Sequence, residues 1–188
     1  MAPYRPLFNG RPIELAGIFI SGDDVTNLPN TAQLRQDLAG HVTVYYAGVA
    51  HPKEWQVARH PGTGKVSAEG VQGFATFDRE FQQLFPGSPL TDGNTMMAYD
   101  ATLTAISAVR LADERQPRPE AVANELGALQ GVHTVLGSSG PIQFTANYQT
   151  SRTGSNPVGK ATPILRLGTD GNPEVLTVIW PAQAPPVS

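Results

Sequence analysis

The sequence predicts an α/β fold in which helices cover both faces of a doubly wound parallel sheet, giving three layers. The first observation is a nearly continuous apolar, β-branched run at residues 12–21, which is typical of a strand buried on both faces. The second is an alternating strand pattern at residues 41–47. The third is that helical patterns separate these segments from later strands, and strands that alternate with helices favour this class.

Size and composition fit one globular unit and exclude several kinds of site. A chain of 188 residues buries roughly 70% of the surface that its unfolded form exposes, so its core needs no crosslinks. The 13 lysines and arginines are scattered and form no basic stripe, which argues against nucleic acid as a partner. Cysteine is absent, which excludes disulfides, thiolate chemistry and cysteine-bound zinc. The histidines lack metal-site spacing, so we expect no metal centre.

The other elements follow from local patterns along the chain. Residues 31–38 form a short predicted helix that Asn30 or Thr31 caps. Residues 74–85 place phenylalanines on one face of a helix, which ends at Pro86. Further along, we expect a helix at 119–129, strands at 163–167 and 175–180 around a turn at 170–173, and a mobile tail at 181–188.

Residues 93–113 give the most informative helical pattern of the chain. One face combines residues at three- and four-residue spacing, namely Met97, Ala101, Thr104, Ala108 and Leu111. Tyr99 lies in the first turn, and helix N-termini bind anionic groups through free N–H groups and the helix dipole. Two interpretations of Tyr99 stay open: it faces a ligand cleft, or it packs in the core with its hydroxyl satisfied.

Four segments of the sequence occur in an order that a known family shares. Ala-Tyr-Asp-Ala occupies residues 98–101, a helix follows at 119–129, Gly-Pro-Ile-Gln-Phe occupies 140–144, and a strand pair comes last. Over roughly residues 13–180, this order resembles the C-terminal half of the type I periplasmic solute-binding proteins, the branched-chain amino acid receptor group of ABC transporters.

The resemblance implies a binding protein with no catalytic residues and no cofactor. Such a protein recognises an amino acid or a similar polar solute, for ABC-type uptake or for sensing. The family is periplasmic or extracellular and is exported with a cleaved signal, whereas no apolar signal segment precedes Leu15 in this sequence. We therefore expect a module of a longer parent protein, through which it would reach an ABC permease.

The resemblance also implies that the chain is divided between two lobes, with crossings near residues 71–75 and 144–150. The predicted parts are a lead or linker at 1–12, part of lobe 2 at 13–75, part of lobe 1 at 76–145, the last crossing and closing strands at 146–180, and the tail at 181–188. Because the family's opening lobe is missing from this pattern, each lobe would expose an unpaired edge. We therefore expect the chain to pair with itself as a homodimer.

The predicted ligand site lies where the first strand ends. In open parallel sheets, ligands gather at the carboxyl ends of strands, and Asp23, Asp24 and Thr26 directly follow such an end. By position, the resemblance assigns the ligand's amino group to Asp23 or Asp24 and places Tyr99 at the same cleft. Tyr46, near the end of the second strand, belongs to an aromatic group that could form a wall of a site. The alternative is that the two carboxylates bond their own backbone in a turn.

Two catalytic or nucleotide-binding motifs are excluded, and three classes of function remain. Residues 62–65 do not form a phosphate-binding loop, because Arg59 and Val66 stand where glycine and a hydroxyl residue are required. No serine lies in a Gly-x-Ser-x-Gly elbow. The remaining classes are a small-molecule binding module, a non-catalytic sensory or assembly domain, and an enzyme that uses Asp23 and Asp24. Adjacent carboxylates diverge, whereas catalytic pairs usually come from separate elements, so the sequence favours binding over catalysis.

Overall fold

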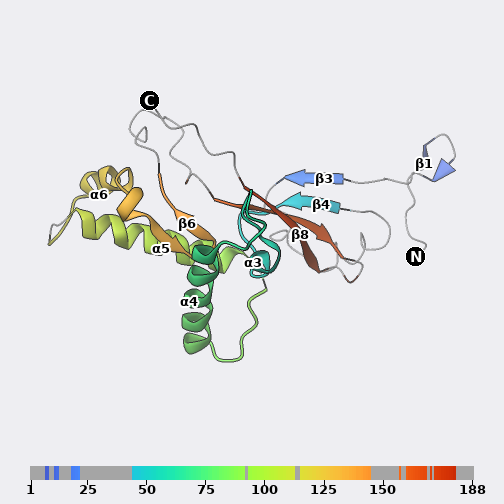
Figure 1. The fold of residues 1–188 in the computed structure, drawn as a ribbon, viewed down its shortest axis with the longest axis horizontal. Helices are drawn as coiled ribbons and strands as arrows, with labels where there is room; N and C mark the ends of the chain where they lie inside the picture. Colours follow the sequence, from blue (N-terminus) through green and yellow to red (C-terminus); the bar gives the residue numbers. More distant parts are fainter. Residues whose placement is uncertain are drawn as a thin grey trace.

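The computed structural model describes residues 7–8, 11–12, 18–21, 44–91, 93–112, 115–144, 157, 160–168, 170 and 172–180. Within these residues, helices combine with small sheets (Figure 1), so the mixed α/β class predicted from the sequence is confirmed. The predicted helix at 31–38 and the predicted tail at 181–188 lie outside the described residues.

The largest described sheet has four strands in the order β3–β4–β7–β8. β3 (Ile18–Ser21) runs parallel to β4 (Val44–Ala47), whereas β4 pairs antiparallel with β7 (Thr162–Leu167), and β7 pairs antiparallel with β8 (Pro173–Ile179). The described part of the sheet is therefore mixed rather than parallel throughout, and the doubly wound arrangement stays a prediction. The predicted turn before the last strand is present, with Asn172 N donating to Asp170 Oδ1 at 2.9 Å.

Two buried clusters hold this sheet together and attach a short helix to it. The first comes from alternating positions of β4 and β7, and consists of Val44, Tyr46, Leu165 and Leu167. The second joins the helix α3 (Glu54–Val57) to β8 through Trp55, Ala58 and Val178. Since α3 lies directly after β4 in the chain, the short connection at residues 48–53 brings α3 beside the distant β8.

The helical part of the protein consists of α4 (Ala68–Leu84), α5 (Asn94–Leu111) and α6 (Pro119–Leu126) (Figure 1). A hairpin of β5 (Val135–Gly137) and β6 (Gly140–Ile142) packs against α4, and β5 also contacts α5. Ser67 caps α4 by accepting a hydrogen bond from Gly70 N. The remaining described elements are the 3₁₀ turn η1 (Gly131–His133) before β5, and β1 (Leu7–Phe8), which pairs antiparallel with β2 (Arg11–Pro12).

Two glycines of α4 allow three elements to approach closely. A Cβ atom at Gly73 would lie 2.1 Å from the carbonyl oxygen of Gly137, in the hairpin. A Cβ atom at Gly70 would lie 2.1 Å from the indole ring of Trp55, in α3. Because both distances are far below van der Waals contact, only glycine at these positions lets α4 hold both the hairpin and α3.

The predicted buried face of α5 is correct in its C-terminal part and wrong in its N-terminal part. Thr104 and Ala108 are buried as predicted. Met97, however, is 38% exposed, and Met96 is fully buried in its place, together with Asp100. The hydrophobic periodicity places the predicted buried face one residue away from the observed one in this part of the helix. The reason is that a carboxylate, Asp100, occupies the inner side of the helix, which periodicity cannot anticipate.

The helix predicted at 74–85 begins earlier, at Ala68, because Ser67 supplies the cap. Residues 71–75, where the sequence predicts a crossing between lobes, therefore lie inside a continuous helix. The division of the chain into two lobes stays a prediction.

Candidate functional site

Three of the five residues predicted to bind a ligand, Asp23, Asp24 and Thr26, lie outside the described residues. The strand that precedes them is described: Ser21, the last residue of β3, pairs with Ala47, the last residue of β4. Because these two strands are parallel, their carboxyl ends share one edge of the sheet.

The two predicted tyrosines are described, and they belong to different buried clusters. Tyr46 is 2% exposed within the core of the four-stranded sheet. Tyr99 packs against Phe77, with ring centroids 4.9 Å apart, and its hydroxyl donates to Glu80 Oε2 at 2.9 Å. Burial and the bond to Glu80 raise the pKa of Tyr99 to about 12. The Tyr99 side chain is thus half-buried and its hydroxyl is bonded within the protein, while its role at a ligand cleft stays a prediction.

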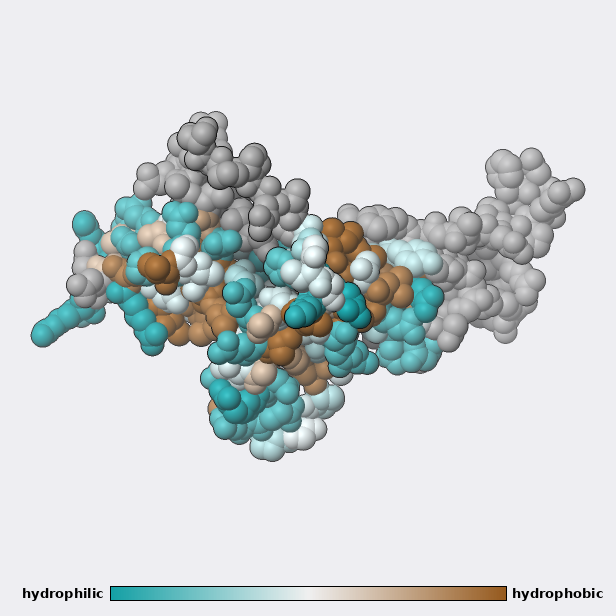
Figure 2. Space-filling view, in the orientation of Figure 1, coloured by the Kyte–Doolittle hydropathy of each residue, from teal (hydrophilic) through white to brown (hydrophobic). Residues whose placement is uncertain are grey.

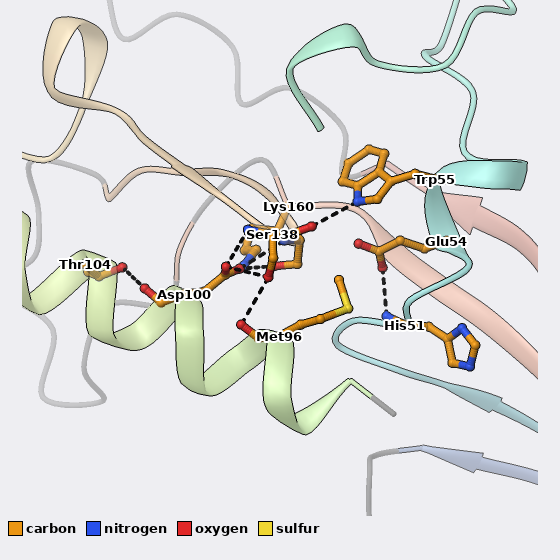
Figure 3. A network of polar contacts seen from close by, with 9 residues as sticks. His51, Glu54, Trp55, Met96, Asp100, Thr104, Ser138 and Lys160 are labelled. Atoms are coloured by element: carbon orange, nitrogen blue, oxygen red, sulfur yellow. Dashed lines mark hydrogen bonds and ion pairs between the residues drawn. The ribbon is translucent and has the colours of Figure 1, made fainter. Parts of the chain in front are cut away.

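A buried polar network surrounds the carboxylate of Asp100, which is 4% exposed (Figure 3). Asp100 Oδ1 accepts from the backbone N–H and, at 2.7 Å, from the hydroxyl of Ser138. Its Oδ2 accepts from the backbone N–H of Ser139 at 3.1 Å, from the Ser139 hydroxyl, and from Lys160 Nζ at 3.1 Å. Five donors thus compensate the charge for the loss of water, which is what a buried carboxylate requires.

The network connects the helical part of the protein to the four-stranded sheet. Trp55 Nε1, in α3, donates to the carbonyl oxygen of Ser138 at 3.0 Å, and Lys160 lies just before β7. Sequence reasoning missed this arrangement. The available signals were a carboxylate on an otherwise apolar helix, Asp100, and a pair of serines between glycines at residues 137–140.

Glu54 is a second buried carboxyl group beside this network, and it is 1% exposed (Figure 3). Its Oε2 accepts from the backbone N–H of His51 at 3.1 Å, whereas its Oε1 is buried and has no hydrogen-bond partner among the described residues. Burial raises the pKa of Glu54 to about 8, and Asp100 acts in the same direction, while His51 N–H and Lys160 oppose them. The side chain is therefore largely protonated at neutral pH.

A solvent-accessible groove of about 560 Å³ lies where α3 and the loop after it meet β8. This volume is in the range of small-molecule sites. The lining includes exposed polar groups and a buried apolar residue, Val178. In full, the described lining residues are Gln56, Val57, Arg59, Pro61, Leu176, Thr177, Val178 and Trp180.

A tight loop fixes the position of the groove's cationic side. The carbonyl oxygen of His60 accepts from the backbone N–H groups of Thr63 and Gly64, and His60 N donates to the carbonyl of Lys65. The N–H groups of Thr63 and Gly64 are thus used within the loop, in line with rejection of a phosphate-binding loop here. Arg59 Nη1 donates to the carbonyl oxygen of Gly64 at 2.8 Å, which anchors the guanidinium group while the side chain stays exposed.

Trp180 forms the aromatic side of the groove. The His60 ring stacks on it with centroids 5.1 Å apart and an angle of 28° between the rings, and Trp55 lies behind it at 6.3 Å. Its indole nitrogen Nε1 is buried and has no hydrogen-bond partner among the described residues. An unsatisfied buried donor is costly to a folded protein.

The described residues contain no group of three or more histidine, aspartate or glutamate side chains arranged to hold a metal ion. Among the helices described here, none has both the length and the apolar character needed to span a membrane. No protein-family model and no curated protein matches the sequence.

Proposed function

We propose that this chain is a solute-binding-protein-like domain that recognises a small polar molecule and does not transform it. The observation that carries the proposal is the groove between α3 and β8, whose lining includes an anchored cation, Arg59, and the aromatic ring of Trp180. A few polar groups placed around an apolar surface are the usual composition of a small-molecule site. In this proposal the complete fold is the doubly wound sheet of the solute-binding proteins, and the parallel pair β3–β4 is its described part.

The chemistry of the groove supports binding rather than catalysis. None of its described lining residues is a carboxylate, a histidine or a lysine, which are the common proton-transfer groups of enzymes. The carboxyl groups of Asp100 and Glu54 lie instead in the protein interior, where Asp100 bonds to neighbouring protein groups. Asp100 joins α5 to the hairpin and to Lys160, whereas Glu54 bonds to His51 in its own segment.

A ligand screen by thermal shift, followed by calorimetry, tests the proposal. The panel contains amino acids, organic acids, amines, sugars and nucleosides. Thr177→Trp places a bulky ring in the groove and is expected to abolish binding, whereas Gln83→Trp, at an exposed position of α4, is the matched control. Absence of binding across the whole panel would contradict the proposed function. Binding that survives Thr177→Trp would keep the function but move the site elsewhere.

A second candidate function, an assembly domain, is favoured by the outer face of α5. Ile106 and Val109 are 41% and 42% exposed, and Figure 2 shows apolar residues gathered over this helix. The exposed positions between Ala98 and Val109 include no charged residue. We take the occupant to be a second copy of the chain, because two such faces meet without like-charge repulsion. Sedimentation should then show a dimer that Ile106→Glu converts to a monomer, and a monomeric parent chain would contradict it.

A further inference from the structure

The charge of the groove is positive and uncompensated within the described part of the chain. Arg59 is the one charged residue among the described lining residues. The two ion pairs found among the described residues join Lys160 to Asp100 and Arg166 to Glu174, so neither supplies Arg59 with a carboxylate. A guanidinium group presents several N–H donors in one plane, and only Nη1 is used by the loop carbonyl of Gly64. The remaining donors suit the two oxygens of a carboxylate.

The lining of the groove also offers flat and apolar surface. Trp180 supplies an aromatic ring, and Val57, Leu176 and Val178 add aliphatic contacts. Planar apolar groups pack favourably against such surfaces.

We propose that the groove between α3 and β8 binds a small carboxylate that carries an aromatic or similarly planar body, with the carboxylate on Arg59 and the body against Trp180. This inference rests on the proposed small-molecule function and specifies its ligand class. An amino acid zwitterion fits the groove less well, because the described lining residues include no carboxylate to receive its ammonium group. The groove thereby separates a simple carboxylate from the amino acid of the same shape.

Two sets of matched probes test the ligand class on the unmodified chain. 3-Phenylpropanoate and L-phenylalanine share a ring and a carboxylate, and only the amino acid carries an ammonium group. Benzoate, benzamide and benzamidinium share a planar shape and differ in charge. By calorimetry, we expect 3-phenylpropanoate to bind more tightly than L-phenylalanine, and benzoate more tightly than benzamide or benzamidinium. The affinity of both carboxylates should weaken as salt is added.

Arg59→Gln tests the assignment to this groove. Removing a charge-assisted contact is expected to weaken binding of 3-phenylpropanoate roughly tenfold to a hundredfold. Arg110→Gln, on the exposed surface of α5, should leave the affinity unchanged. Thermal melting of each variant verifies that it is folded. If Arg59→Gln fails to fold, the ligand class is decided on the unmodified chain, from the relative affinities of the matched probes and from the salt dependence of their binding.

The outcomes separate this inference from the proposed function. If benzamide or benzamidinium binds as well as benzoate, or if L-phenylalanine binds as well as 3-phenylpropanoate, the ligand class is wrong while small-molecule binding stands. If carboxylates bind but folded Arg59→Gln binds them equally well, the groove assignment is wrong. If neither these probes nor the wider panel bind, both the inference and the proposed function are overturned.

Discussion

Glu54 should make the stability of this protein fall as pH rises from about 4.5 to about 8, the ordinary and the folded-state pKa of its carboxyl group. Above pH 4.5 the unfolded chain releases this proton, whereas the folded chain keeps it, because burial disfavours the charged form. The unfolded state then binds fewer protons than the folded state, so the free energy of unfolding decreases with pH. Multiplying the difference between 4.5 and about 8 by about 1.4 kcal/mol per pH unit gives about 5 kcal/mol over the whole range.

Glu54→Gln removes this titration with little change in shape. The side-chain carbonyl of glutamine is able to accept the hydrogen bond that Glu54 Oε2 now takes from His51 N–H. We expect the two proteins to be similar in stability at pH 4.5, and the variant to gain up to about 5 kcal/mol over the parent by pH 8. The gain should grow steadily across this window.

Urea unfolding at pH 5, 6, 7 and 8 measures the effect, and the difference between variant and parent isolates Glu54 from other titrating groups. Glu69→Gln, at an exposed acidic position in the first turn of α4, is the control and should show no such growing difference. A constant difference between Glu54→Gln and the parent from pH 5 to pH 8 would refute the reasoning. It would mean that the buried carboxyl group ionises equally readily in the folded and unfolded chains.

Three further substitutions test the packing around the network by urea unfolding. Asp100→Asn should lower the free energy of unfolding by about 3–5 kcal/mol, because the amide cannot accept from all of the buried donors that face the carboxylate. A loss below about 1 kcal/mol would contradict this role of Asp100. Gly73→Ala should destabilise the protein by about 1–3 kcal/mol despite the better helix propensity of alanine, because a Cβ would lie 2.1 Å from a hairpin carbonyl oxygen. The control is Gln72→Ala at the exposed neighbouring position, which should be close to neutral. Equal losses of stability in the two variants would argue against the close approach. Tyr99→Phe should cost about 1 kcal/mol, since it loses the bond to Glu80 and keeps the ring packing, and no loss would show that this bond contributes nothing to stability.

Local sequence patterns predicted α4, α5, α6 and the last strand pair, because the signals for these elements lie within a few residues, but they missed α3 and the β5–β6 hairpin. Ser67, ahead of the phenylalanine face, is the cap that extends α4 beyond its predicted start. The turn around Asp170 is stabilised by a hydrogen bond between Asp170 and Asn172, so neighbouring residues are enough to predict this turn. Such features depend on spacing and on local polar groups.

The network and the groove could not be predicted in the same way, because their parts are far apart in the chain. Asp100 finds its donors 38 and 39 residues later, at the serine pair, and 60 residues later, at Lys160. The groove combines Arg59 with Trp180, which only the packing of α3 on β8 brings together. The hydrophobic pattern of the helix does not include Asp100 in the predicted face, and only its bonds to the hairpin explain its burial.

The two tryptophan indole N–H signals offer the most direct test of the central claim, that the groove between α3 and β8 is a carboxylate-binding site. Trp55 donates its N–H to the carbonyl of Ser138 inside the network, whereas the N–H of Trp180, which lines the groove, has no partner among the described residues. In a ¹H–¹⁵N correlation spectrum of the full chain, assigned with Trp180→Phe, titration with 3-phenylpropanoate should move the Trp180 indole signal in a saturable way and leave the Trp55 signal nearly fixed. A Trp180 signal that stays unchanged throughout the titration would contradict the claim.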